Sequence, residues 1–197
     1  MPIAAWTDAI LALCAGLTAL ALLGQGPPSA RTTGIGLLLV ALAASVGALR
    51  LSGSDQLAFP HDALSGVAAI VGLPLVGAGW VTAAFRPDRA SQARIAVLAP
   101  LLLASLGLWH LPLVRTALGG AGMLAVLVAS GRVARTHPIA ATMGAAGALL
   151  TVGVGLGIGT NGELMGFPRV GWFHLGLAAG AIGLGGVVRI APRASVD

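Results

Sequence analysis

Three histidines and two aspartates are the side chains of this sequence with the greatest potential for chemistry. His61, His110, His174, Asp8 and Asp62 all fall near the ends of long apolar stretches. Imidazole nitrogens are common zinc ligands, and a catalytic zinc takes about three protein ligands while one position stays open for water. The metal can lower the pKa of that water to about 7, which supplies hydroxide for hydrolysis. The sequence therefore suggests a zinc site formed by the three histidines, with Asp8 or Asp62 as the base or as a partner of a ligand.

These candidate ligands do not share a helix. No two of the histidines stand three or four residues apart, the spacing that places side chains on one helical face. A metal site would therefore be assembled wholly by the packing of separate helices. His174 is the strongest single candidate, because it falls one turn inside an apolar stretch with no polar neighbour on its own helix. A histidine at membrane depth is costly unless it faces the bundle interior or water.

The other candidates also have ordinary structural interpretations. Thr7 and Asp8 are residue types favoured at the start of a helix, where they interact with exposed amides and with the helix dipole. Asp62 is a plausible cap for the helix that follows it, and His110 has a normal position at a membrane interface. The choice between these interpretations and a functional role stays open from the sequence.

Seven apolar stretches must position these residues. A membrane-spanning helix needs roughly 20 mostly apolar residues, the mean hydropathy is strongly positive, and only 9% of the residues are charged. The stretches are continuously apolar rather than alternating, which favours helices over a barrel. We expect one all-α domain over residues 1–197, a transmembrane bundle of about seven helices in which the second and fifth are short. The predicted spans are Trp6–Leu23, Gly34–Leu49, Ala63–Phe85, Ile95–Leu111, Thr116–Ser130, Pro138–Ile158 and Val170–Val188.

The arginines predict the orientation of this bundle. All eleven basic residues are arginines, and the side of a membrane that carries more of them is normally cytoplasmic. One side collects Arg31, Arg86, Arg89, Arg94, Arg132, Arg135, Arg189 and Arg193; the other holds Arg50, Arg115 and Arg169. The N-terminus is thus expected outside and the C-terminus in the cytoplasm. The five candidate residues then share the outer side, whereas Asp88, His137 and Asp197 lie on the inner one.

Composition bears on location and partners. The lysine-free usage, rich in Ala, Gly, Leu and Arg, is typical of a GC-rich bacterial genome, so a bacterial inner membrane is the expected location. The net charge of +5 does not indicate nucleic-acid binding, because no stripe of basic and aromatic residues accompanies it. The expected partners are membrane lipids. Trp80 is expected at the inner interface, as part of an aromatic belt.

Glycines spaced four residues apart form small faces on two of the predicted helices. The pairs are Gly153 with Gly157 and Gly176 with Gly180. Such faces let helix backbones approach closely in lipid. They favour tight packing within the bundle, and association with another membrane protein or a second copy is the alternative.

The layout of the chain resembles that of the alkaline ceramidase/PAQR-like (CREST) superfamily. Thr7-Asp8 in the first span and Trp172-Phe173-His174 in the last are the matching residues. More closely similar are small bacterial seven-helix membrane proteins with a Thr-Asp in the first span and an aromatic-His motif in the last. The resemblance implies a seven-helix fold and, in members with hydrolase activity, a zinc site made by Ser-x-x-x-His in the second span and His-x-x-x-His in the seventh.

The chain departs from that zinc motif. Arg50 lies near the place of the expected histidine after Ser45, and Ala178 stands four residues after His174. Two of the three zinc ligands that the resemblance implies are therefore missing, which indicates that this chain lacks the family chemistry. Three functions stay open. We favour a non-catalytic accessory or scaffold membrane subunit with an outward-facing His/Asp cluster. The alternatives are a zinc-dependent hydrolase acting on a lipid at the outer leaflet, and a small transporter or channel.

Overall fold

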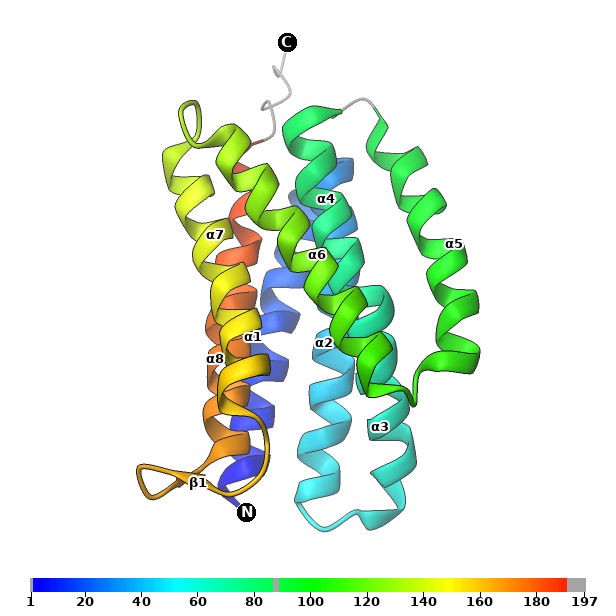
Figure 1. Ribbon diagram of the computed structural model, residues 1–197, viewed down its shortest axis with the longest axis vertical. Coiled ribbons are helices and arrows are strands. Elements are labelled where there is room, and N and C mark those ends of the chain that lie inside the picture. Colours follow the sequence, from blue (N-terminus) through cyan, green and yellow to red (C-terminus); the bar gives the residue numbers. More distant parts are fainter. Residues whose placement is uncertain (1, 87–88, 191–197) are drawn as a thin grey trace.

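The computed structural model describes residues 2–86 and 89–190, which form a bundle of helices running alternately up and down (Figure 1). Asp88, Arg193 and Asp197, predicted on the cytoplasmic side, fall outside these ranges. Six of the described helical segments are long and apolar enough to cross a membrane, which is compatible with an integral membrane protein. The fourth predicted span contains a shorter apolar helix, Ser91–Ser105. The six long segments are Ile3–Gly24, Pro28–Leu51, Asp55–Phe85, Pro112–Val133, Pro138–Ile158 and Arg169–Arg189.

The six long segments surround one core. The helices are α1 (Ile3–Gln25), α2 (Pro28–Leu51), α3 (Ala58–Val67), α4 (Leu73–Phe85), α5 (Ala90–Leu108), α6 (Pro112–Val133), α7 (Pro138–Gly153) and α8 (Arg169–Leu184). Contacts run from α1 to α2, then to α4, α6, α7 and α8, and back to α1, so these helices form a closed ring. Helix α5 stands outside the ring and packs mainly against α4 (Figure 1).

Short segments extend several of these helices. The segment Asp55–Leu57 (η1) precedes α3, and Gly185–Arg189 (η5) follows α8. Two π-helical segments lie within spans, Ala68–Gly72 (η2) between α3 and α4, and Val154–Ile158 (η4) after α7. Gly72 in the first of them packs closely on α2, since a Cβ there would lie 2.9 Å from the carbonyl oxygen of Gly36.

The second and fifth spans are longer than predicted. Helix α2 has 24 residues and α6 has 22, so the expectation that these spans are short is wrong. Both begin at a proline, whose missing amide hydrogen is harmless in the first turn of a helix. The threonine one turn later donates its hydroxyl back to that proline's carbonyl oxygen, from Thr32 to Pro28 at 2.9 Å and from Thr116 to Pro112 at 3.0 Å. The polar first turns therefore continue the helices beyond the apolar stretches.

One small hairpin interrupts the helical fold. Strands β1 (Glu163–Leu164) and β2 (Phe167–Pro168) pair antiparallel before α8. Met165 and Gly166 form the turn with φ of 56° and 74°, the left-handed conformation that two-residue hairpin loops require. The indole nitrogen of Trp172 donates to the carbonyl oxygen of Leu164 at 3.1 Å, which ties the hairpin to the start of α8.

Glycine allows the closest helix contacts of the ring. Where α4 crosses α6, a Cβ on Gly77 would lie 3.0 Å from the Cα of Gly122. Between α7 and α8, a Cβ on Gly180 would lie 2.6 Å from the hydroxyl of Thr151. The predicted Gly176 and Gly180 face thus packs within the chain. Gly153 and Gly157, by contrast, have open space around their Cα atoms.

The crossing of α4 and α6 gives a direct test of this packing. A Cβ on Gly122 would lie 2.6 Å from the carbonyl carbon of Leu73, which is backbone and cannot move aside. We therefore expect Gly122→Ala to lower the free energy of unfolding in detergent by about 1–3 kcal/mol. The matched control is Gly120→Ala on the same helix, which meets nothing within 4 Å and should leave stability equal or higher. Equal loss of stability in both variants would contradict the crossing.

Trp80 is not at an interface, so its prediction as part of an aromatic belt is wrong. The side chain is fully buried, and its indole nitrogen donates to the carbonyl oxygen of Leu184 at 3.0 Å. The ring lies against Gly144 of α7, because a glycine has no side chain to occupy the space that the ring fills. Trp6, on the outer surface of α1, is exposed.

Candidate functional site

The contact between α1 and α8, which closes the ring, contains a buried acid and base. Asp8 lies in the second turn of α1 and His174 in the second turn of α8, and these helix starts share one end of the bundle (Figure 1). The carboxylate oxygen Oδ1 of Asp8 lies 3.3 Å from Nδ1 of His174. Asp8 is 1% exposed and His174 is 8% exposed. We call this contact the Asp8–His174 pair.

Thr7 also faces the histidine of this pair. Its hydroxyl donates to the carbonyl oxygen of Ala4 at 3.0 Å, and its oxygen lies 3.4 Å from Nδ1 of His174. Helix α1 begins at Ile3, so Thr7 and Asp8 are inside the helix. The interpretation of Thr7-Asp8 as a helix start is therefore wrong. The two residues instead face the last helix of the chain.

The second oxygen of the Asp8 carboxylate is buried without a hydrogen-bond partner among the described residues. It lies over Gly47 of α2, where a Cβ would be 2.5 Å from Oδ2 of Asp8 and 2.8 Å from Cε1 of His61. The absence of a side chain at Gly47 therefore makes room for both groups. Nδ1 of His61 also lies 3.2 Å from the carbonyl oxygen of Ala43, which is one turn before Gly47 on the same helix.

Arg50 and His61 add charge and polarity to the surroundings of the pair. Arg50 lies one turn after Gly47 on α2, and its positive charge acts favourably on the Asp8 carboxylate. His61, near the start of α3, acts electrostatically on His174. Three spans besides α1 thus contribute polar groups to one end of the bundle.

This geometry can orient a proton acceptor. When Nδ1 of His174 carries its hydrogen, it donates to Asp8 or to the oxygen of Thr7, and this fixes the tautomer in which Nε2 is the basic nitrogen. A carboxylate that orients an imidazole in this way is a recurring part of acid–base sites. The same contact also serves as an internal polar tie between two helices.

The structure does not bring every predicted residue to this place. Asp62 is 54% exposed in its side chain and forms an ion pair with Arg115, whose Nη1 and Nη2 both lie 3.0 Å from its Oδ1. Helix α3 begins at Ala58, so the prediction that Asp62 caps it is wrong.

His110 is exposed just after the end of α5, with its ring edge-on to that of Trp109. No three His, Cys, Asp or Glu side chains are grouped as metal ligands within residues 2–86 and 89–190. The zinc site stays a hypothesis for experiment.

Two members of the site were not predicted from the sequence. Gly47 is one of 30 glycines and has no local feature that marks it. The sequence indicates Arg50 as a marker of orientation and as a departure from the zinc motif, not as a neighbour of Asp8. Gly47 and Arg50 are one turn apart and so lie on the same side of α2. This spacing would place both residues near α1 only if the side of α2 that faces inward were already known.

No protein-family model matches this chain. Nor is any curated protein or solved structure significantly similar to it. The resemblance to the CREST superfamily stays a prediction, and what the chain does must be inferred from its own residues.

Proposed function

We propose that this chain is a non-catalytic, multi-pass subunit of a bacterial inner membrane, whose His/Asp cluster joins its first and last helices. The enclosure of the Asp8–His174 pair supports this proposal, since the two side chains are 1% and 8% exposed and offer little access to a substrate. A buried polar group is costly unless it has a partner. Pairing these two groups therefore favours one register of α1 against α8 over others.

In this proposal the Asp8–His174 end of the bundle faces outward and the other end faces the cytoplasm. The support comes from the arginines at the opposite helix ends, because cytoplasmic segments are enriched in them. These are Arg31, Arg86, Arg89, Arg94, Arg132, Arg135 and Arg189. The outward-facing end holds the smaller set, Arg50, Arg115 and Arg169.

A subunit of this kind needs a surface for another membrane protein or a second copy. The proposal assigns that contact to the face around Gly153 and Gly157. Both glycines are exposed and have open space beside them, and small residues let a neighbouring helix approach closely in lipid.

One observation favours a second function, zinc-dependent hydrolysis of a lipid at the outer leaflet. The unpaired Oδ2 of Asp8 is a buried acceptor beside His61, and such groups often bind a water or an ion. One carboxylate and two imidazoles, from Asp8, His61 and His174, are a donor set that catalytic zinc accepts, but in the described residues these side chains are not grouped as metal ligands. The positive charge of Arg50 beside Asp8 opposes a cation there.

Metal content separates the two functions. We expect protein purified in detergent without chelators to hold no stoichiometric zinc by elemental mass spectrometry, because no three His, Cys, Asp or Glu side chains of the described residues are grouped as metal ligands. His174→Ala and the exposed control His110→Ala should behave like the wild type. About one zinc per chain that is lost in His174→Ala and kept in His110→Ala would instead establish a catalytic-type metal site and overturn the proposal.

A further inference from the structure

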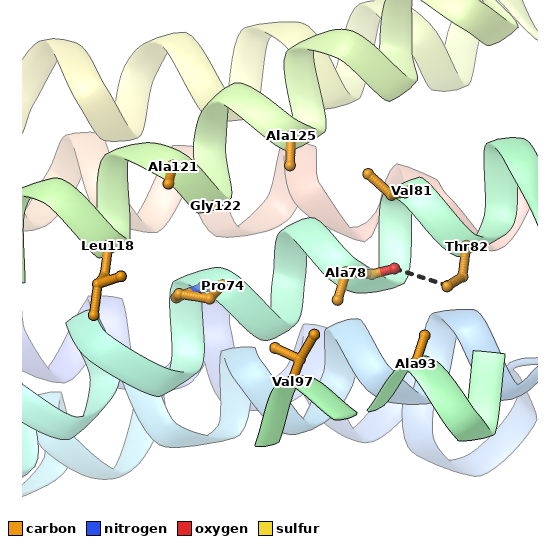
Figure 2. A pocket seen from close by; sticks show the side chains of 10 residues that line it. All are labelled: Pro74, Ala78, Val81, Thr82, Ala93, Val97, Leu118, Ala121, Gly122 and Ala125. Atoms are coloured by element: carbon orange, nitrogen blue, oxygen red, sulfur yellow. Dashed lines mark hydrogen bonds between the residues drawn. The ribbon is translucent and has the colours of Figure 1, made fainter. Parts of the chain in front are cut away.

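An apolar groove of about 340 Å³ lies between α4, α5 and α6 (Figure 2). Alanines make it hollow, with Ala78 on α4, Ala93 on α5 and Ala121 on α6 facing the space. Thr82 contributes the one hydroxyl among the lining side chains, and this hydroxyl donates to the carbonyl oxygen of Ala78 at 2.8 Å. The groove therefore offers an occupant almost no polar group.

The groove exists because α5 packs closely along only part of its length. Near the π-helical segment and the start of α4, larger side chains of α5 such as Leu98 and Leu101 cover the small cluster that contains Ile70 and Leu75. Toward the end of α4, the groove is lined on the side of α5 by Ala93. Figure 2 shows the resulting hollow along α4, with Leu118 and Pro74 near one end and Thr82 and Ala93 near the other.

The size of the groove fits a hydrocarbon chain. From Pro74 to Thr82 it follows eight residues of helix, which is about 12 Å at 1.5 Å per residue. Inside a membrane the material that meets such a surface is acyl chain, because water is excluded there. The dimensions and the apolar walls thus favour one acyl chain.

Positive charge lies at one end of this groove. Arg86 follows Thr82 by one turn, with its amide donating to the Thr82 carbonyl oxygen at 3.0 Å, and its side chain is exposed. Arg94 follows Ala93 on α5 and is half-buried. Guanidinium groups bind phosphate through two parallel hydrogen bonds, and basic residues at membrane interfaces attract anionic headgroups. We propose that the groove binds one acyl chain of an anionic phospholipid whose phosphate contacts Arg86 and Arg94.

Native mass spectrometry of the full chain in detergent tests this proposal. The probes are phosphatidylglycerol and phosphatidylcholine with identical acyl chains. We expect the wild type to retain about one phosphatidylglycerol, bound about tenfold more tightly than phosphatidylcholine, which corresponds to the added charge-assisted hydrogen bonds. The double variant Arg86→Gln/Arg94→Gln should lose this preference and keep the weaker binding of both lipids.

Filling the groove tests the acyl-chain part separately. Ala121→Phe should abolish retention of both lipids, whereas Ala99→Phe, at an exposed position of α5 that does not line the groove, should retain them. Ala93→Leu provides a second, smaller filling variant if Ala121→Phe does not fold. Equal retention in the wild type and the filled variants would overturn the proposal. So would conversion of a dimer to a monomer by Ala121→Phe, because the occupant would then be a second copy of the chain.

Discussion

Asp8→Ala is expected to lower the free energy of unfolding by about 3 kcal/mol, because breaking a buried pair by removing one partner leaves the other without compensation. His174 is 8% exposed. In this variant its Nδ1 would keep a single polar neighbour, the oxygen of Thr7 at 3.4 Å. The variant also leaves a void over Gly47. Asp8→Asn should cost less, about 1 kcal/mol, since its amide oxygen still accepts a hydrogen bond from His174.

Reversible unfolding in mixed micelles measures these differences. The matched control is Asp62→Ala, which removes a carboxylate that is 54% exposed and paired with Arg115. An exposed ion pair contributes at most about 1 kcal/mol, so this control should change little. A double-mutant cycle with His174→Ala should give a coupling of about 1–3 kcal/mol between Asp8 and His174. If Asp8→Ala were no more harmful than Asp62→Ala, the Asp8–His174 pair would not hold α1 to α8.

Trp80→Ala is expected to cost about 3–5 kcal/mol, as do other truncations of large buried aromatic residues. The indole is fully buried, lies against Gly144 and donates to the carbonyl oxygen of Leu184. Truncation would therefore remove the packing of α4 on α7 and a hydrogen bond from α4 to α8. Trp80→Phe keeps most of the ring and should cost about 1–2 kcal/mol for the unpaired carbonyl.

The control for this prediction is another tryptophan of the same chain. Trp6 is 58% exposed on α1, and its replacement by alanine should change the free energy of unfolding by no more than about 0.5 kcal/mol. Thermal unfolding in detergent, followed by circular dichroism, compares the three variants. A loss of stability in Trp6→Ala as large as in Trp80→Ala would show that Trp80 is not the central packing residue.

The positions of the helices could be predicted from the sequence because the signal for a span is local. A helix in lipid satisfies its own backbone hydrogen bonds, so about 20 consecutive apolar residues are sufficient to indicate one. The predicted span Pro138–Ile158 has the same bounds as the observed segment. Errors arose at polar helix starts such as Pro28, where proline and a hydroxyl bonded to the backbone continue a helix that hydropathy does not reveal.

The candidate site could be predicted only in part. His174 stood out because a lone histidine inside an apolar stretch needs a partner, but the sequence could not say that Asp8, 166 positions earlier, would be that partner. It gave Asp62 the same rank, although Asp62 is exposed and pairs with Arg115 instead. The close approach of Asp8 and His61 depends on Gly47, which is important only because of what packs against it.

The sequence by itself determined that the chain is helical and roughly where six of its apolar spans lie. Only the tertiary structure decided which side of each helix faces inward, and hence that Trp80 is in the core and that Gly176 and Gly180 pack within the chain. The physical reason is the solvent. A soluble helix shows its buried side as an apolar stripe. In lipid both sides of a helix are apolar, and close packing together with a few polar contacts between helices selects which side meets its neighbours.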